Sequence, residues 1–249
     1  MNDMELKILG SSSAGNCYLL DNGKETLMIE CGVSFRKVLE GMNFDVGRIA
    51  GCIVSHEHGD HSNGIPEALK YCIPVAMSNG TADALKLPDN HLVKRVEALK
   101  AFSFGNFKVM PFKVKHDAAE PFGYLINHPE TGTVLFATDT YYLEQTFMGL
   151  SNIMLECNYD INILDANIAS GVVPEKLRNR TVKSHMSVET CIETLKANDL
   201  SGVNNILLIH LSANNSNASE FKKAVREVTG KNVIIAAKGM NIEFNKEPF

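Results

Sequence analysis

Three histidines and an aspartate fall within six residues of the chain, in the stretch 55–61, which reads S-H-E-H-G-D-H. The stretch directly follows the apolar run 51–54, so these side chains would bring polar atoms that need partners into a buried neighbourhood. Imidazole and carboxylate groups are ligands of Zn, Mn or Fe, and no cysteine lies within the stretch to complete a closed structural zinc site. The stretch therefore predicts a metal site with open, catalytic coordination.

The local geometry supports this interpretation. Ile53 and Val54 are expected to end a buried strand, and Gly59 is expected to break regular structure just beyond it. On such a turn His56 and His58, two residues apart, can point to one centre, while the following Asp60 and His61 can turn toward a second. A surface histidine cluster without metal is the alternative, which the density of the motif disfavours.

Further ligand-type residues follow apolar runs that predict strands. His116 follows the run ending at 115, Asp139 the run ending at 138, and His210 the run ending at 209, while His185 precedes a predicted helix. Each residue alone could be an exposed strand end, a turn former or a satisfied core histidine. Together with the first motif they predict one site built from several strand ends. The two remaining histidines have turn-like neighbours and are expected on the surface: His91 and His128.

The elements that must position these residues alternate between strands and helices. Short β-type runs predict strands at 6–9, 17–20, 26–30, 73–77, 102–114, 122–127, 133–137, 153–155, 206–209 and 233–237, with a hairpin turn at 21–23. Apolar spacing and capping residues predict helices at 34–41, 65–72, 79–85, 187–198 and 218–228. Two runs of strands, each followed by helices, predict an α/β (α+β) fold in which four layers form an αββα sandwich. We expect one domain over residues 1–249.

Composition excludes several classes of protein. The 249 residues carry a net charge of -5 and a pI near 5.9, so there is no overall attraction to polyanions. The N-terminus has no apolar signal region and no run reaches transmembrane length, which predicts a cytoplasmic protein with no membrane partner. The six cysteines are scattered, mostly in apolar runs, and are expected to be buried free thiols.

One local basic run departs from this acidic background. It contains Lys176, Arg178, Arg180 and Lys183 and leads directly to His185. Such a run can bind phosphate groups, or it can be the solvated face of a helix or loop. Its position next to His185 favours a phosphate-binding patch.

The motifs resemble those of the metallo-β-lactamase fold superfamily over essentially the whole chain. Residues 56–61 match its H-x-H-x-D-H motif, and three later residues match its single-residue motifs. The resemblance implies that His56, His58 and His116 hold one divalent ion, that Asp60, His61 and His210 hold a second, and that Asp139 bridges them. The ions are expected to be Zn or Mn, with Fe also possible. Because lactonases, thioesterases, sulfatases and nucleases share these ligands, the substrate is less well specified.

A closer resemblance is to the YycJ/WalJ-type branch of this superfamily. It rests on the segments 9–16, 155–160, 184–187 and 210–215, with Cys157 as a departure from the expected smaller residue. Members of this branch are described as DNA-processing hydrolases, so the resemblance implies a dinuclear-metal phosphodiesterase, with DNA exonuclease activity and DNA as the partner. It also implies that a metal-bridging hydroxide attacks the phosphodiester and that Asp60 orients this hydroxide or takes its proton. His185, tuned by Glu156, is expected to protonate the leaving oxygen or to bind phosphate.

The residues expected to contact substrate are Arg178, Arg180, Lys183, Ser187 and Asn214. Asp139 and His210 are only 71 residues apart, which excludes the large cap domain of some nucleases of this fold.

Two other functions remain open at this point. A small-molecule hydrolase, such as a lactonase or thioesterase, would need an apolar acyl pocket, and a non-catalytic scaffold protein would not need all seven ligand positions to be filled.

Overall fold

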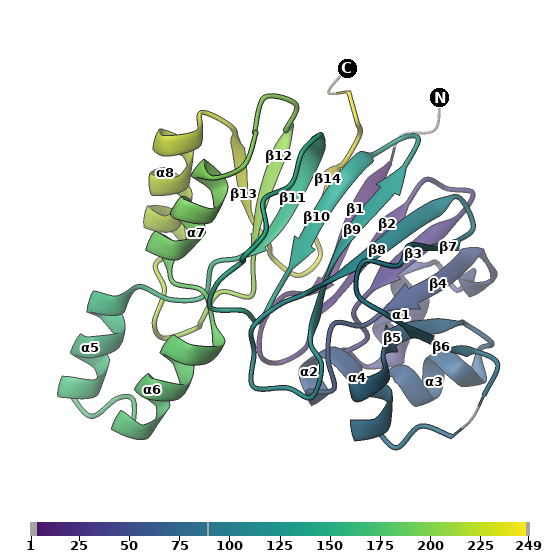
Figure 1. Ribbon diagram of the computed structural model, residues 1–249, viewed down its shortest axis with the longest axis horizontal. Coiled ribbons are helices and arrows are strands. Elements are labelled where there is room, and N and C mark those ends of the chain that lie inside the picture. Colours follow the sequence, from purple (N-terminus) through teal and green to yellow (C-terminus); the bar gives the residue numbers. More distant parts are fainter. Residues whose placement is uncertain (1–3, 89, 248–249) are drawn as a thin grey trace.

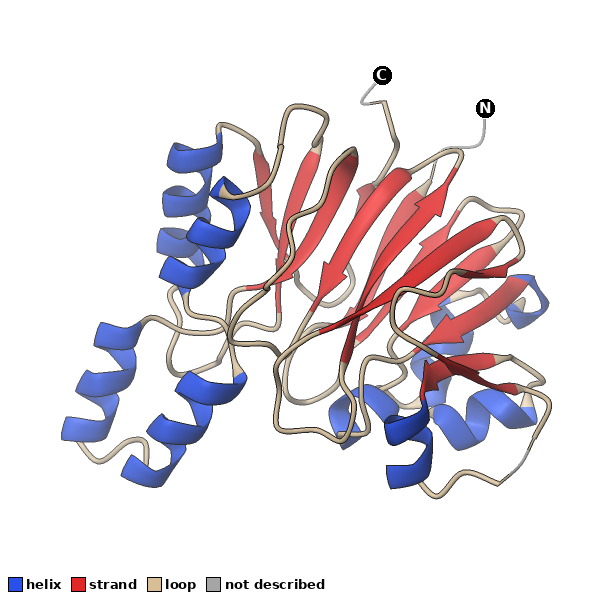
Figure 2. Ribbon diagram, viewed as in Figure 1, coloured by secondary structure: helices blue, strands red, loops and turns tan. Residues whose placement is uncertain are grey.

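The computed structural model describes residues 4–88 and 90–247 as two facing β-sheets with helices on both outer sides (Figures 1 and 2). Strand β2 (Cys17–Asp21) shows how the alternation of side chains builds these layers. Tyr18 and Leu20 pack into the cluster between the two sheets, whereas Cys17 and Leu19 pack into the cluster under the helices. The predicted αββα layering is therefore confirmed.

The first sheet contains seven strands in the order β14-β1-β2-β3-β4-β5-β6. Its other strands are β1 (Glu5–Gly10), β3 (Thr26–Ile29), β4 (Ile49–Ile53), β5 (Val75–Ser78), β6 (Val93–Val96) and β14 (Asn241–Glu243). Strands β3 to β6 are parallel neighbours, and the strands on the other side of β3 are antiparallel. Helices that follow these strands cover the outer face: α1 (Phe35–Gly41), the short η1 (Val46–Arg48), α2 (Gly59–Ser62), α3 (Ile65–Lys70) and α4 (Asn79–Ala84).

The second sheet has the order β13-β12-β11-β10-β9-β8-β7. Its strands are β7 (Phe102–Phe104), β8 (Phe107–Lys113), β9 (Phe122–His128), β10 (Gly132–Ala137), β11 (Leu150–Glu156), β12 (Asn205–Ile209) and β13 (Asn232–Ile235). Helices α7 (Val188–Lys196) and α8 (Ala218–Thr229) pack on its outer face. Two more helices, α5 (Ile161–Ala169) and α6 (Glu175–Ser184), form a hairpin that projects from the sandwich at the lower left of Figure 1.

The structure corrects three expectations from the sequence. Gly59 does not end regular structure but begins α2, which carries Asp60 and His61. His128 is buried, with its ring 4.6 Å from that of Phe107, because it ends β9 at the core-facing side of the sheet. Cys72 is exposed, while the other five cysteines are buried free thiols.

Candidate metal centre and active site

The ligand-type residues meet at one edge of the sandwich because their strands run in the same direction. Strands β10, β11 and β12 are parallel, and β8 points the same way as β10 because both are antiparallel to β9. His116, Asp139 and His210 come just after the carboxyl ends of β8, β10 and β12. In the first sheet β4 ends just before His56. The carboxyl ends of strands from both sheets thus form the site, as in many α/β proteins.

A first group of possible ligands contains His56, His58, His116 and Asp139. One ligand atom from each of the four lies within 4.8 Å of those of the others. Nε2 of His116 is 3.2 Å from Nδ1 of His58, and Oδ2 of Asp139 is 3.6 Å from Nε2 of both His56 and His116. These atoms surround a space of the size that a divalent ion needs.

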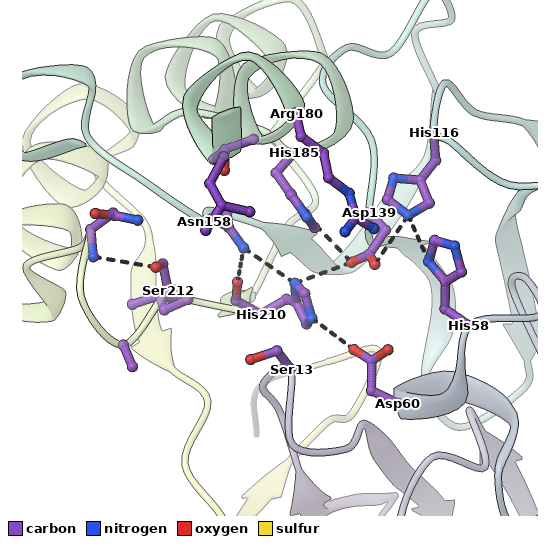
Figure 3. Close-up of a pocket in the computed structure, with 15 residues that line it drawn as sticks. Ser13, His58, Asp60, His116, Asp139, Asn158, Arg180, His185, His210 and Ser212 are labelled. Carbon is purple, nitrogen blue, oxygen red and sulfur yellow. Dashed lines mark hydrogen bonds and ion pairs between the residues drawn. The ribbon is translucent and has the colours of Figure 1, made fainter. Parts of the chain in front are cut away.

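A second group contains Asp60, His61, Asp139 and His210, also within 4.8 Å. Nε2 of His61 lies 3.2 Å from Oδ2 of Asp139 and 3.3 Å from Oδ2 of Asp60. Nε2 of His210 lies 3.4 Å from the same oxygen of Asp60 (Figure 3). Asp139 belongs to both groups, so its carboxylate lies where the two groups meet.

Partners behind the histidine rings fix which nitrogen faces the centre. Nδ1 of His61 lies 3.2 Å from Glu30, and Nδ1 of His56 lies 2.9 Å from the hydroxyl of Ser55. The backbone carbonyl of Ser184 accepts a hydrogen bond from Nδ1 of His116 over 2.9 Å. Such contacts set the tautomer and orientation of a metal-binding imidazole.

The backbone is strained where it carries three of these residues. Glu30, Asp139 and His210 have φ values of 64°, 48° and 55°, in the left-handed region that residues with a Cβ rarely adopt. Each residue directly or nearly follows the end of a strand, and the turn aims its carboxylate or imidazole into the site. Strain of this kind collects at functional sites.

The residues fit divalent ions on one further observation. Nε2 of His56 is fully buried and makes no hydrogen bond with any part of the chain that the structure describes. A buried polar atom without a partner is costly, and an ion held by the first group would supply that partner. The set of imidazole and carboxylate donors, without thiolates, suits Zn, Mn or Fe.

A third cluster of Asp139, Glu156, His185 and His210 has a different explanation. Oε1 of Glu156 accepts hydrogen bonds from Nδ1 of His185 at 2.7 Å and from Nδ1 of His210 at 3.3 Å. The backbone N–H of Thr140 donates to its other oxygen at 2.8 Å. Glu156 is therefore a buried carboxylate that orients two imidazoles, and its oxygens already have donors.

These contacts set the charges of two residues that open to the cavity. Burial alone lowers the pKa of His185, but the Glu156 carboxylate raises it, and the net result lies above the ordinary value. Burial raises the pKa of Asp60, yet contacts with His210 and His61 hold it well below its usual range. Asp60 is thus an anion at neutral pH, and the Glu156 carboxylate favours the protonated form of His185.

A cavity of about 340 Å³ opens above both groups. Its lining is mostly polar and comes from the 11–16 loop, both groups, helix α6 and the loop after β12 (Figure 3): Ser13, His58, Asp60, His116, Asp139, Asn158, Leu177, Arg180, Thr181, His185, His210, Leu211, Ser212, Ala213 and Asn215. Arg180 brings a positive charge to this lining, and the raised pKa of His185 favours a second one.

The five residues predicted to contact substrate fall in different places. Arg180 lines the cavity and pairs with Asp117 at 3.0 Å, whereas Arg178 pairs with Asp165 on α5, away from it. Lys183, Ser187 and Asn214 are not among the described residues that line the cavity. Ser187 caps α7 by accepting a hydrogen bond from the backbone N–H of Thr190. Asn215 lies in the wall instead of its neighbour Asn214.

Sequence reasoning missed polar residues that lie around the site without being ligands. The amide of Asn158 donates to the backbone carbonyl of His210 at 2.7 Å, and Asn16 contacts Nε2 of His61 at 3.2 Å. The hydroxyl of Ser11 accepts a hydrogen bond from the backbone N–H of His210. Asn16 and Ser11 belong to the Gly- and Ser-rich loop 10–16. The composition of this loop indicates a tight turn, but it does not show that the loop contacts His61 and His210.

Comparison with known proteins identifies relatives of two kinds. The family model "Anti-Pycsar protein Apyc1" matches residues 4–73. Exodeoxyribonuclease YycJ of Bacillus anthracis is 25% identical over 243 residues, which cover 90% of this chain and 89% of the relative. Exodeoxyribonuclease WalJ of Streptococcus pneumoniae is 28% identical over 225 residues, which cover 84% and 82%. The resemblance to the YycJ/WalJ-type proteins is thereby confirmed.

Solved structures share the arrangement of the layers. The metallo-β-lactamase fold protein YhfI of Bacillus subtilis superposes with a TM-score of 0.73 at 17% identity, covering 96% of this chain and 99% of that one. The fold is therefore the metallo-β-lactamase fold. Within the described residues no helix has the length and apolar character needed to cross a membrane.

Proposed function

We propose that this chain, a metal-dependent hydrolase with the metallo-β-lactamase fold, cleaves phosphodiester bonds in nucleic acid and acts on DNA as an exonuclease. The observation that carries the proposal is the position of His185 and Arg180 above two ligand groups that share Asp139. Two cationic side chains over a dinuclear centre complement the charge of a phosphodiester. The relatives named exodeoxyribonuclease support the choice of DNA.

We propose that two divalent ions are bound, Zn or Mn with Fe as a further possibility. His56, His58 and His116 would hold one ion, Asp60, His61 and His210 the other, and Asp139 would contact both. When bound, the ions would supply a water of lowered pKa and positive charge that stabilises the phosphate. The rest of the reaction falls to side chains of the chain itself.

Asp60 and His185 take the proton-transfer roles. Asp60 lies on α2 with its carboxylate at the cavity floor, where as an anion it orients the attacking water and accepts its proton. His185 is bonded through Nδ1 to Glu156, so its Nε2 is the atom available to the substrate. From there it donates a proton to the oxygen that leaves.

Arg180 is the residue of α6 that we propose to bind a phosphate oxygen. It is paired with Asp117, the neighbour of His116, so a bound phosphate would compete with that carboxylate for the guanidinium. Arg178 provides a matched control because it has the same side chain on the same helix but faces Asp165.

The cavity does not favour a small-molecule esterase. A lactonase or thioesterase would need an apolar acyl pocket, yet only Leu177, Leu211 and Ala213 contribute hydrocarbon side chains among the described residues of the lining.

The test is hydrolysis of 5′-phosphorylated duplex DNA, single-stranded DNA and RNA, and of a lactone and a thioester, by the protein with added Mn or Zn. We expect cleavage of DNA from an end, lost by more than about a hundredfold in Asp60→Ala and His185→Ala. Arg180→Ala should raise KM and reduce the slope of log KM against log salt by about one, while Arg178→Ala should not. Cleavage of the esters but of no nucleic acid would refute the proposal.

A further inference from the structure

Two adjacent tyrosines outside the cavity have rings that face solvent. Tyr141 and Tyr142 follow Asp139 by two and three residues, and their side chains are 40% and 48% exposed. They lie in the connection between β10 and β11, where Leu143 and Phe147 are buried in the core beneath helix α7. The connection is thus anchored by a buried apolar pair, while Tyr141, Tyr142 and Met148 are left exposed.

The backbone under these rings is held firmly to the active site. The hydroxyl of Thr140 accepts a hydrogen bond from the backbone N–H of Lys115 at 3.0 Å and donates one to the carbonyl of Tyr142 at 2.8 Å. The N–H of Thr140 donates to Glu156, and the N–H of Tyr141 donates to the carbonyl of Lys115. The two rings are therefore presented by a segment that is fixed to Glu156 and to the residue before His116.

The position of the pair relative to the reacting phosphate can be bounded. Two residues of extended chain span at most about 7 Å, so the backbone of Tyr141 lies within that distance of Asp139. Successive nucleotides in a stacked strand rise by about 3.4 Å each. These residues therefore lie within the length of the next few nucleotides of a strand whose phosphate lies over Asp139.

Charged side chains of both signs lie near the pair. Lys113 and Lys115 are exposed at the end of β8, and Lys115 forms an ion pair with Glu144 at 2.5 Å. A protein interface would be expected to continue into more apolar surface, whereas exposed aromatic rings beside lysines are typical of sites that bind single-stranded nucleic acid.

We propose that Tyr141 and Tyr142 form a stacking shelf for unpaired bases next to the bond that is cleaved. The inference rests on the proposed function and deepens it, because it makes a single strand, or a duplex end that has frayed, the substrate class of the site. Stacking on a ring tolerates every base, so the shelf would confer preference for unpaired strands without preference for sequence.

The experiment compares a single-stranded DNA oligonucleotide with thymidine 5′-monophosphate p-nitrophenyl ester, which is too short to reach the shelf. In the double variant Tyr141→Ala, Tyr142→Ala we expect KM for the oligonucleotide to rise at least about tenfold, with KM and kcat for the ester unchanged. Tyr141→Phe, Tyr142→Phe should retain the oligonucleotide KM, because the rings remain. Met148→Ala, which changes an 87% exposed side chain of the same connection, is the matched control.

A binding measurement keeps this inference separable from the proposed function. The chain has six tyrosines and no tryptophan, so its ultraviolet emission comes from tyrosine alone. Oligonucleotide added in the presence of a chelator, where no cleavage occurs, should quench part of this emission in the wild type and not in the double alanine variant. Equal oligonucleotide binding and KM in both proteins would overturn the shelf, as would equal losses on the oligonucleotide and the ester. A wild type that binds but cleaves neither substrate would refute the proposed function and leave the shelf supported.

Discussion

The two ends of the sandwich both bury polar side chains, but they satisfy them differently. At the end opposite the cavity, Asn232 donates to Asn205 at 2.8 Å, Asn205 donates to Asn152 at 2.9 Å, and Asn152 donates to the backbone carbonyl of Asn245 at 3.1 Å. This chain of amides, which we call the asparagine ladder, joins β13, β12 and β11 to the segment after β14. Each amide uses its neighbour as partner, and the ladder runs from the exposed Asn232 through the half-buried Asn205 to the fully buried Asn152.

At the cavity end the carboxylates and imidazoles crowd together, and one buried nitrogen lacks such a partner. Nε2 of His56 has no hydrogen-bond partner in the described chain, and Asp139 and His210 adopt left-handed backbone. An end that carries strain and an unpaired buried nitrogen is arranged for a ligand, whereas the ladder end is arranged for stability. Substitutions at the two ends should therefore affect different quantities.

The largest effect is expected from Asp139→Ala. Its carboxylate belongs to both ligand groups, so its loss should reduce the rate of oligonucleotide hydrolysis by about a thousandfold or more. The measurement is kcat/KM at saturating metal, with circular dichroism to confirm that the variant is folded. If the rate of the variant stayed within about tenfold of the wild-type rate, the cavity end could not be called the end that is arranged for a ligand.

The counterpart at the ladder end is Asn152→Ala. Asn152 is fully buried, and its removal takes one hydrogen bond from the carbonyl of Asn245, which keeps the amide of Asn204 as donor. It also takes one from the amide of Asn205, which keeps the carbonyl of Glu243 as acceptor. We expect the free energy of unfolding to fall by about 2–4 kcal/mol, as measured in urea, while kcat/KM of the folded protein stays unchanged. Asn241→Ala, at an exposed position of β14, should change stability by less than about 0.5 kcal/mol. Loss of activity without loss of stability in Asn152→Ala would contradict this assignment.

The two ends also differ in how far the sequence predicts them. The motif at 56–61 and the residues after three strands predict the ligand groups because their types cannot be explained by packing. The ladder residues are asparagines whose neighbours in space come from distant segments, so Asn152 and Asn232 have no signal that the sequence alone could provide. Pairing across strands depends on register, which is fixed only when the sheet forms.

Other residues were missed for related physical reasons. The helix α6 has few apolar positions and buries little, so its polar sequence could equally be a loop. His128 looks exposed beside a proline, but the alternation of β9 turns it toward Glu25 and the core. Gly59 is a poor helix former, yet it starts a four-residue helix held by its neighbours.

A smaller effect at the cavity end should come from Glu156→Gln. Because Glu156 raises the pKa of His185, the imidazolium is present below that raised pKa and is lost as the pH rises through it. The variant lacks the negative charge, so the alkaline limb of the pH profile of kcat/KM should move to lower pH, with a loss of about 10- to 100-fold. A lower rate with an unmoved limb would show that Glu156 only supports the fold.

The smallest effect concerns Asp21, a buried carboxylate near the ladder end that pairs with Lys7 at 2.7 Å and Arg48 at 2.8 Å. Burial raises the pKa of Asp21, but the hydrogen bonds from Lys7, Gly23 and Thr26 lower it by more than burial raises it. The net pKa therefore lies below the ordinary value. Its contribution to stability is therefore present above an unfolded pKa near 3.9 and is lost as the pH falls through the folded value. Asp21→Asn should be less stable by about 1 kcal/mol at pH 7 and equal to the wild type in strong acid. A difference that does not depend on pH would contradict this account.

The measurement that tests the central claim most directly is a titration of chelator-treated protein with Mn or Zn, followed by the rate of hydrolysis of a 5′-phosphorylated DNA strand. The account predicts no cleavage without metal and a rate that rises to a plateau at two equivalents per chain, because each of the two groups around Asp139 would hold one ion. Cleavage that persists after the metal is removed, or no cleavage at any metal concentration, would contradict it.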